Sequence, residues 1–337
     1  MKALVTGGGG FLGRKIVELL VSRGDRVRVI GRNRYPELEA LGAECLQADI
    51  RSASDCSTAC MGMDAVFHVA ALAGIWGDPK LFHGINVLGT RNIIEGCKRR
   101  GVPKLIYTSS PSVVFDMKDE CGIDEKTPYP ETFYNIYSRT KAEAEMMVLG
   151  SSGRDGLFAT ALRPHLIWGP RDNHLLPRLI QRNQSGKLKI VGDGKNKVDL
   201  TFVDNAAVAH LLACDVMTGK RVAGEAYFIS DGQPVVLWDW INDFFRRMRL
   251  PKVQRSVSTG TAYYVGACLE AAFWLIRRRK EPPMTRFLAK TLSCSHYYSI
   301  HKARRDFGYK PVVSNEDGVK RTVEFFLANM PKNPSAK

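Results

Sequence analysis

Three glycines near the start of the chain constrain its fold more than any other feature. Gly7, Gly10 and Gly13 follow an apolar run at residues 2–6 and open a helical pattern at residues 12–23. Glycine allows a tight turn there and lets the backbone approach a pyrophosphate group, whose charge is stabilised by the helix N-terminus. A strand, a glycine turn and a helix in this order predict the first unit of a dinucleotide-binding α/β sheet.

The alternation of strand and helix continues through the first half of the chain. Further buried strands are predicted at 26–30, 65–69, 104–108 and 158–163, and helices at 89–100 and 134–149. This order is typical of a doubly wound parallel sheet, the Rossmann arrangement. We therefore expect a dinucleotide-binding domain at residues 1–170, to which residues 198–232 return. Residues 171–337 are expected to form mainly a smaller, C-terminal substrate-binding region.

Composition narrows the class of protein. The 337 residues are 45% hydrophobic and 25% charged, as in ordinary globular proteins. The eight cysteines contain no C-x-x-C pair and the seven histidines no H-E-x-x-H run, so we expect no metal site and no disulfide framework. Because no signal-peptide pattern precedes the first strand, a cytoplasmic protein is expected. A net charge of +15 fits an anionic ligand or surface, but no nucleic-acid-binding motif accompanies it.

The end of the second predicted strand bears on the choice of nucleotide. An enzyme that uses NAD would carry an acidic residue here to bind the ribose 2′-hydroxyl. This chain has Gly31 instead, followed by Arg32 and Arg34. A guanidinium group is well shaped to bind a 2′-phosphate, so the sequence favours NADP(H) over NAD(H). The alternative is that both arginines are solvated loop residues.

A tyrosine and a lysine four residues apart form the candidate catalytic pair. Tyr137 and Lys141 share one face of a predicted helix, one turn apart. A neighbouring cation lowers the pKa of a phenol, which would make Tyr137 a usable acid or base. Ser110 follows the strand at 104–108, at the carboxyl edge where such sheets bind ligands, and would hold a substrate oxygen beside Tyr137. The alternative is a hydroxyl-rich strand end that bonds only to its own backbone.

Several short segments share a pattern with a known family. They lie at residues 6–13, 49–50, 68–71, 86–90, 107–110, 137–141, 163–170 and 202–205. Together they resemble the extended short-chain dehydrogenase/reductase family and, within it, the 3β-hydroxysteroid dehydrogenase branch. The resemblance implies catalysis by Ser110, Tyr137 and Lys141, the last two also contacting the cofactor. It further implies cofactor contacts from Phe11, Leu12, Asp49, Ile50, Ala70, Ala71, Thr108, Pro164 and Leu166.

The second half of the chain resembles a narrower group. Residues 192–199, 281–288 and 303–309 are similar to the reductases of long 2-alkyl-3-keto acids in bacterial olefin biosynthesis. This resemblance implies an NADP(H)-dependent reductase of a lipid-like keto acid, with a second copy or other enzymes of the pathway as candidate partners. A 3β-hydroxysteroid or sterol dehydrogenase, a nucleotide-sugar epimerase with the same three catalytic residues, and a catalytically silent cofactor-binding regulator stay open as alternatives.

One segment matches none of these expectations directly. Residues 261–276 are almost entirely apolar and precede four consecutive basic residues at 277–280. The stretch is shorter than the about 20 residues that span a bilayer. Residues 277–321 alone carry twelve of the basic and four of the acidic residues, a net charge of +8. A helix at 261–280 is therefore either a core helix or a lid whose basic end contacts an anionic membrane, an acidic partner or the substrate.

Overall fold

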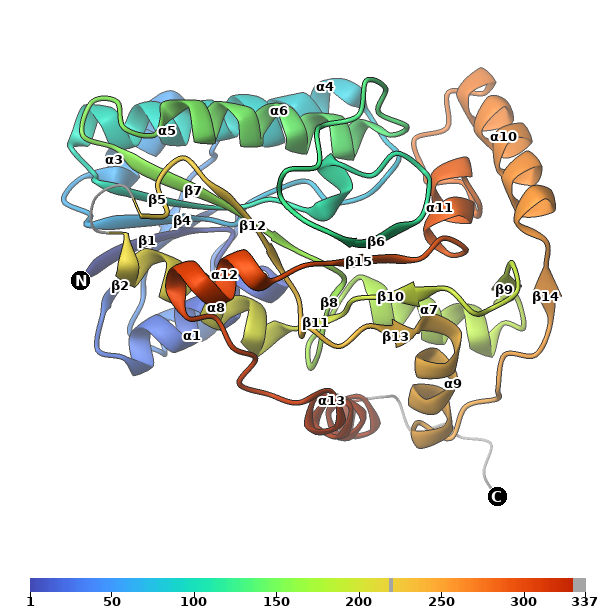
Figure 1. Ribbon diagram of the computed structural model, residues 1–337. Helices are drawn as coiled ribbons and strands as arrows, with labels where there is room; N and C mark the ends of the chain where they lie inside the picture. The colour runs from blue at the N-terminus through green and yellow to red at the C-terminus, as the bar shows by residue number, and fades with distance from the viewer. Residues whose placement is uncertain (218–220, 330–337) are drawn as a thin grey trace.

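A seven-stranded parallel sheet lies at the centre of the molecule (Figure 1). The computed structural model describes residues 1–217 and 221–329. The strand order is β12-β7-β5-β4-β1-β2-β3. The strands are β1 (Lys2–Thr6), β2 (Arg26–Gly31), β3 (Glu44–Gln47), β4 (Ala65–His68), β5 (Lys104–Thr108), β7 (Phe158–Pro164) and β12 (Ala226–Ile229). The order reverses between β1 and β4, which is where doubly wound sheets open a ligand crevice.

Helices cover both faces of this sheet (Figure 1). One face carries α1 (Phe11–Ser22), α8 (Val203–Val216) and α12 (His301–Phe307), and the other carries α3 (Ala53–Cys60), α5 (Gly89–Arg100) and α6 (Ile136–Ser151). The connections contain the short helices α2 (Pro36–Glu39), α4 (Pro79–Phe82), the π-helix η1 (His83–Leu88) and the 3-10 turn η2 (Pro111–Val113). Each face has its own buried apolar cluster, so the sheet is sealed from water on both sides.

The second region lies beyond the carboxyl ends of the strands. It contains three small sheets, whose strand orders are β13-β10-β15-β6, β11-β8 and β14-β9. These strands are β6 (Glu120–Ile123), β8 (Ile167–Trp168), β9 (Ile190–Val191), β10 (Lys197–Val198), β11 (Thr201–Phe202), β13 (Val235–Val236), β14 (Ser256–Val257) and β15 (His296–Tyr298). Its helices are α7 (Leu175–Gln184), α9 (Leu237–Arg247), α10 (Thr259–Leu275), α11 (Arg286–Thr291) and α13 (Asn315–Asn329). An aromatic cluster built around Trp168, Trp240 and Phe244 forms its core.

The fold class predicted from the sequence is confirmed, and most of the predicted elements lie within two residues of the observed ones. The two edge strands, β3 and β12, were not predicted as strands. Strand β12 pairs with β7, so part of the range 198–232 lies in the central sheet. Residues 218–220 and 330–337, which belong to the expected ranges 198–232 and 171–337, are outside the described residues.

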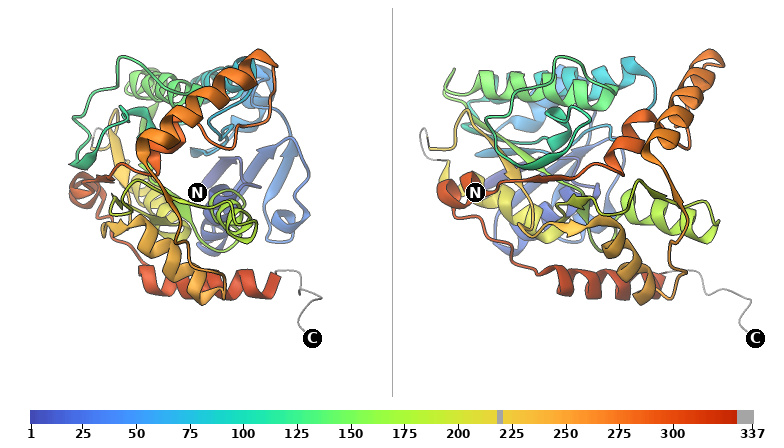
Figure 2. Two further views of the ribbon diagram at one scale, coloured as in Figure 1. Left: turned by 90° about the vertical axis from the view of Figure 1, so that its right-hand side faces the viewer. Right: turned by 45° about the vertical axis from the view of Figure 1, so that its right-hand side comes forward.

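Helix α10 differs from every expectation of a core helix. It leans away from the body at the edge of the second region (Figure 2). Its buried residues are Ala262 and Gly266, and the large side chains near its outer end face solvent. The interpretation of this segment as a core helix is therefore wrong. None of the helices in the described residues has the length and apolar character needed to cross a bilayer.

Candidate active site

A cavity of about 600 Å³ opens at the carboxyl ends of β1, β4, β5 and β7. All the site residues predicted from the sequence line it, with the exception of Arg34. Those that line it are Gly7, Gly10, Phe11, Leu12, Gly13, Arg32, Asp49, Ile50, Ala70, Ala71, Thr108, Ser110, Tyr137, Lys141, Pro164 and Leu166. Residues far apart in the sequence thus meet in one crevice at the point where the strand order reverses.

The glycine turn forms one wall of the cavity and leaves room for an anionic group. Gly7 has a positive φ of 70°, and a Cβ there would lie 2.9 Å from the backbone of Ala70. A Cβ on Gly13 would collide with the Gly7 carbonyl oxygen. No side chain caps the start of α1 after Gly10, so its first backbone N–H groups are available to a ligand. These residues fit the pyrophosphate of a dinucleotide.

Tyr35 explains part of the sequence at the end of β2. Its ring lies against Gly9 and Gly31, where any side chain would collide with it. Packing against the Tyr35 ring therefore favours glycine at position 31, where an NAD enzyme would carry an acidic residue. Neither Tyr35 nor its neighbour Asn33, which also lines the cavity, was predicted, because a contact across the glycine turn has no local signal.

Two guanidinium groups lie on the cavity wall beyond β2. They belong to Arg32 and to Arg51, which was not predicted. The hydrogen bonds of Arg51 to Asp49, 3.0 and 3.1 Å from Nε to the two carboxylate oxygens, lower the pKa of Asp49. Arg34 is exposed and does not line the cavity. Arg32 is thus the arginine of the predicted pair that is positioned toward a nucleotide.

Helix α6 positions the candidate catalytic tyrosine in its first turn. The Asn135 side chain caps the helix by accepting a hydrogen bond from the Ser138 N–H at 2.8 Å. Burial raises the pKa of Tyr137, and the hydrogen bond with Ser110 acts in the opposite direction. The rise is opposite to the lowering expected from Lys141, because burial disfavours the charged phenolate. Tyr137 therefore stays protonated at neutral pH, the form that can donate a proton.

Lys141 lies one turn further along α6, inside the protein. Its Nζ donates a hydrogen bond to the Thr108 carbonyl oxygen at 2.5 Å and lies 4.1 Å from the centre of the Tyr107 ring. Burial lowers the pKa of Lys141 to about 7, and the charge of Glu145 opposes that shift. The ammonium group is therefore close to its titration point at neutral pH, which suits a group that exchanges protons.

A buried ion pair supports this part of α6 and was not predicted. Glu145 accepts hydrogen bonds from Arg163 on β7, one of them 3.0 Å long from Nε to Oε2, and another from the Tyr129 hydroxyl at 2.7 Å. Both charged side chains are shielded from solvent. Glu145 is four residues beyond Lys141, so the pair fixes the helix turn that carries the lysine. The sequence shows that Glu145 lies four residues after Lys141, but it does not show that Arg163 on β7 is the partner of Glu145.

Asn86 ties the opposite wall of the cavity to the same helix. It accepts a hydrogen bond from the Leu72 N–H at 2.7 Å and donates to the Leu72 carbonyl oxygen and to the Thr140 hydroxyl. The loop that contains Ala71 and Leu72 is therefore held against α6. This loop lines the cavity with apolar groups beside the two hydroxyls of the site.

The carboxylates of the cavity lining are already engaged. Asp49 binds Arg51, and Asp172 accepts hydrogen bonds from the N–H groups of His174, Leu175 and Leu176 at the start of α7. A free acidic group beside Ser110 and Tyr137, as elimination of water from a sugar would need, is absent from the residues described for this lining.

Comparison with known proteins decides the family. The model of the 3-beta hydroxysteroid dehydrogenase/isomerase family matches residues 4–258. The chain belongs to this family. It is therefore an oxidoreductase of a family that depends on a nicotinamide cofactor, as the resemblance of its motifs to the extended short-chain dehydrogenases and reductases implied.

Two relatives allow a narrower comparison within the family, and one solved structure allows a comparison of the fold. The 2-alkyl-3-oxoalkanoate reductase of Stenotrophomonas maltophilia is 47% identical over 326 residues, 95% of this chain and 98% of the relative. The human sterol-4-alpha-carboxylate 3-dehydrogenase (decarboxylating) is 34% identical over 96% of this chain and 88% of the relative. The structure of a UDP-glucuronic acid 4-epimerase from Bacillus cereus in complex with NAD has a TM-score of 0.73 and 21% identity, with coverage of 97% and 99%. At that identity the last likeness concerns the fold alone.

Proposed function

We propose that this member of the family reduces the 3-keto group of a long 2-alkyl-3-oxoalkanoate to a hydroxyl group, with NADPH as the reductant. The observation that carries the proposal is the placement of Ser110 and Tyr137 against an apolar wall. That wall includes Leu72, Ala73, Ile85, Leu166 and Ile167. The similarity to a 2-alkyl-3-oxoalkanoate reductase over nearly the whole of both chains supports the substrate class.

The catalytic roles follow from the chemistry of three side chains. The Ser110 hydroxyl orients the keto oxygen, and Tyr137 donates its proton to that oxygen as the alcohol forms. Lys141, with a pKa of about 7, is positioned to stabilise the phenolate that results. The nicotinamide cofactor, when bound at the glycine turn, supplies the hydride to the keto carbon. The apolar wall excludes water and accommodates alkyl chains.

A substrate panel tests the activity. NADPH oxidation is followed spectrophotometrically with a 2-alkyl-3-oxo acid, with a 3-keto sterol and with a UDP-sugar. We expect turnover of the keto acid with formation of the 3-hydroxy acid. Turnover of the sterol alone would replace the proposal with a sterol dehydrogenase, the alternative supported by the 34% identical human relative. Epimerisation of the UDP-sugar without net oxidation would overturn it.

The preference for NADPH has its own matched pair of variants. Loss of a charge-assisted hydrogen bond to the 2′-phosphate costs about 1.5–3 kcal/mol, or about ten- to a hundredfold in affinity. Arg32→Ala should therefore weaken NADPH binding by that factor and leave NADH binding almost unchanged. Arg34→Ala is the control, because Arg34 does not line the cavity. A wild-type protein that binds NADH more tightly than NADPH would contradict the proposed cofactor.

A further inference from the structure

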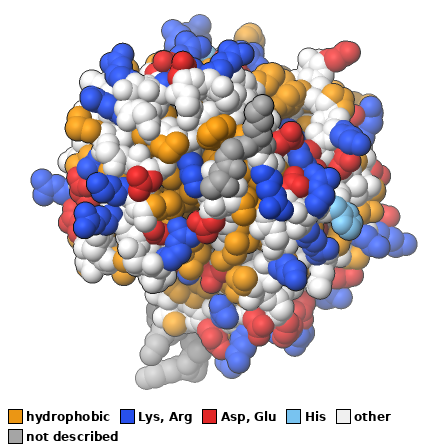
Figure 3. Space-filling model, turned by 60° about the vertical axis from the view of Figure 1, so that its left-hand side comes forward, with side chains coloured by type: hydrophobic (Ala, Val, Ile, Leu, Met, Phe, Trp, Pro, Cys, Tyr) orange, Lys and Arg blue, Asp and Glu red, His pale blue; other side chains and the backbone are white. Residues whose placement is uncertain are grey.

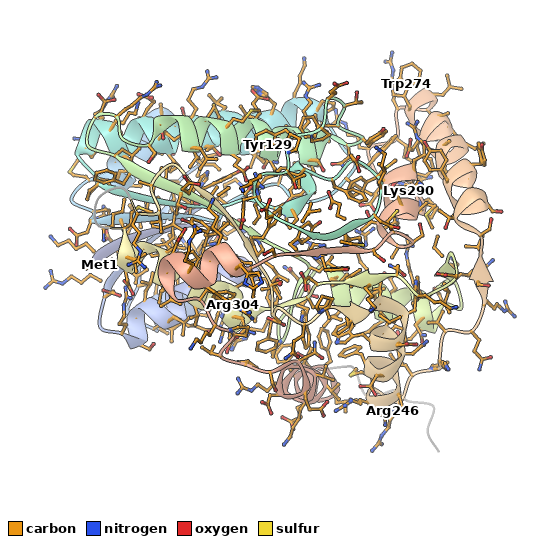
Figure 4. All side chains as sticks on the ribbon, viewed as in Figure 1. Met1, Tyr129, Arg246, Trp274, Lys290 and Arg304 are labelled. Carbon is orange, nitrogen blue, oxygen red and sulfur yellow. The ribbon has the colours of Figure 1, made fainter. Side chains whose placement is uncertain are left out.

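The outer end of α10 exposes large apolar side chains. Trp274 and Leu275 are each 76% exposed, and Ile276, the residue that follows the helix, is 63% exposed. Trp274 lies at the tip of the helix and points away from the body, whereas Lys290 on α11 lies nearer to it (Figure 4). Exposed large apolar groups that gather at one tip mark a surface that contacts something else.

One side of α10 packs against α11 and the residues that precede it. Gly266 lies so close to Thr285 and Arg286 that a Cβ would be 2.6 Å from the Thr285 carbonyl carbon. Glu270 accepts a hydrogen bond from the Arg286 N–H and forms an ion pair with its guanidinium, each at 2.7 Å. These contacts hold α10 on α11, and the large side chains of Trp274 and Leu275 at its far end stay exposed.

Four exposed basic residues, Arg277 to Lys280, come directly after α10 and Ile276. Arg278 lies 5.0 Å from the centre of the Phe273 ring. Two acidic residues of the described chain lie near this group: Asp78, 3.9 Å from Arg279, and Glu281, which follows Lys280 and forms an ion pair with Arg178. The tip is therefore strongly positive, whereas basic, acidic and apolar side chains are interspersed on the face shown in Figure 3.

The tip also contacts the loop that leads to the candidate active site. The Trp76 indole N–H donates a hydrogen bond to the Arg278 carbonyl oxygen at 3.1 Å. Residues 71–73 of the same loop line the active-site cavity. Residues 76–79 line a second cavity of about 500 Å³ together with the end of α10. A molecule bound at the tip would therefore lie against the segment that borders the site.

We propose that the tip of α10, defined as residues 273–280, docks on the surface of an anionic lipid bilayer. Apolar side chains enter the interface while adjacent cations bind the lipid phosphates, the two contributions that together give stable peripheral attachment. Tryptophan is well suited to this depth, because its ring is apolar and its N–H is polar. A protein partner fits less well, since the cores of protein interfaces are depleted of charged residues and bury at least about 1,000 Å². The helix lies at the bilayer and does not cross it.

Docking in this position would turn the loop at residues 71–79 toward the bilayer. A long-chain substrate could then pass from the lipid phase along that loop to the cavity. This inference goes beyond the proposed reduction and does not depend on it, because binding to vesicles is measured without any substrate.

The test is sedimentation of the full chain with large vesicles. We expect binding to phosphatidylcholine vesicles that contain phosphatidylglycerol, and little binding to phosphatidylcholine alone. Binding should weaken as salt rises, because the Debye length falls from about 30 Å at 0.01 M to about 3 Å at 1 M. Iodide quenching of tryptophan fluorescence should decrease on binding. Trp274→Phe should remove most of that change, since Trp168, Trp238 and Trp240 are buried and Trp76 is half-buried with its N–H bonded to the Arg278 carbonyl oxygen, whereas Trp274 is 76% exposed.

Matched variants assign the binding to the tip. Each basic residue close to an anionic surface contributes a factor of about five in affinity. Replacement of Arg277, Arg278, Arg279 and Lys280 by Gln should therefore weaken binding about 10²-fold or more. The control variant replaces four exposed basic residues elsewhere by Gln and should retain most of the affinity for the vesicles. These residues are Lys126, Arg154, Lys310 and Lys320. Replacement of Trp274, Leu275 and Ile276 by Ser should also weaken sedimentation with the anionic vesicles, a readout that does not depend on the Trp274 fluorescence.

Three outcomes would overturn the proposal. The first is a wild-type protein that stays in the supernatant with anionic vesicles at low salt. The second is an equal loss of binding in the control variant, which would make the attraction an effect of net charge. The third is concentration-dependent self-association that the triple Ser variant removes, which would make a second copy of the chain the occupant of the tip. Circular dichroism of each variant shows that a loss of binding is not a loss of folding.

Discussion

Helices α8 and α10 have a similar apolar character and opposite surroundings. Both consist largely of apolar residues and lack a continuous polar face. Helix α8 packs between α1 and the central sheet, and most of its residues are buried. Its buried His210 is bonded at both nitrogens, to the Ala206 carbonyl oxygen at 2.7 Å and to the Thr108 hydroxyl at 2.8 Å. Helix α10 packs mainly on α11, and its buried residues are Ala262 and Gly266.

The difference shows what an apolar pattern can predict. An apolar pattern predicts that a helix is buried against something. It does not predict whether the contact comes from the same chain, from another protein or from a membrane. In the sheet region, α8 is buried by α1 and by strands of the central sheet, which the fold brings together. At α10 no such element follows in the described part of the chain, so the apolar side chains stay exposed.

Catalysis should depend on Tyr137 and should not depend on the exposed end of α10. Tyr137→Phe should lower kcat by about 10²- to 10⁴-fold, the range for loss of a general acid, with unchanged stability. The triple Ser variant at residues 274–276 should leave kcat for a short, soluble keto acid within about twofold, because none of these residues lines the cavity. Tyr134→Phe, at an exposed tyrosine of the same segment, is the control for Tyr137. Normal turnover in a folded Tyr137→Phe protein would exclude Tyr137 as the acid.

Removal of a carboxylate should have unequal effects in the two regions. Glu145→Ala leaves the Arg163 charge buried without its partner and should lower the free energy of unfolding by about 3–5 kcal/mol. Glu270→Ala breaks the ion pair of α10 with Arg286, which is partly in solvent, and should cost about 0–1 kcal/mol. Denaturant unfolding measures both values. Similar losses would show that α10 is held as firmly as α6.

The same substitution of a leucine tests the comparison of the two helices directly. Leu211 on α8 is buried, and Leu275 on α10 is exposed. Leu211→Ala should lower the free energy of unfolding by about 2–5 kcal/mol through lost burial and a cavity. Leu275→Ala should change it by no more than about 0.5 kcal/mol. A loss above 2 kcal/mol at Leu275 would mean that the tip of α10 is covered in solution.

A pH dependence of stability distinguishes a buried lysine of the sheet region from an exposed one near α10. Burial lowers the pKa of Lys141 to about 7, from about 10.4 in an unfolded chain. Between these values the unfolded chain binds the proton more strongly, so this lysine makes stability rise with pH by at most about 1.4 kcal/mol per unit. Lys141→Met should remove that slope between pH about 7 and about 10. The exposed Lys280→Met should leave it unchanged, and parallel curves for all three proteins would contradict the buried position of the Lys141 charge.

The site could be predicted from the sequence where one local segment supplies both the geometry and the chemistry. The glycine turn, the Tyr137–Lys141 spacing and the strand end at Ser110 are such segments, and all of them line the cavity. Contacts between distant segments could not be predicted. Tyr35 against Gly9 and Gly31 is one example, and Arg163 against Glu145 is another. The direction of the Tyr137 pKa shift was wrong for the same reason, since burial depends on everything that packs around the ring.

The sequence by itself determined the class of fold, the five inner strands of the central sheet and the family of the protein. Strand and helix periodicities and the glycine turn are local properties, and each depends on residues within a few positions of one another. Only the tertiary structure decided that Arg32, and not Arg34, lines the cavity, and that α10 is exposed while α8 is buried. Which side of a turn faces a cavity, and which apolar helix finds a cover, depends on elements that are far apart along the chain and adjacent only after folding.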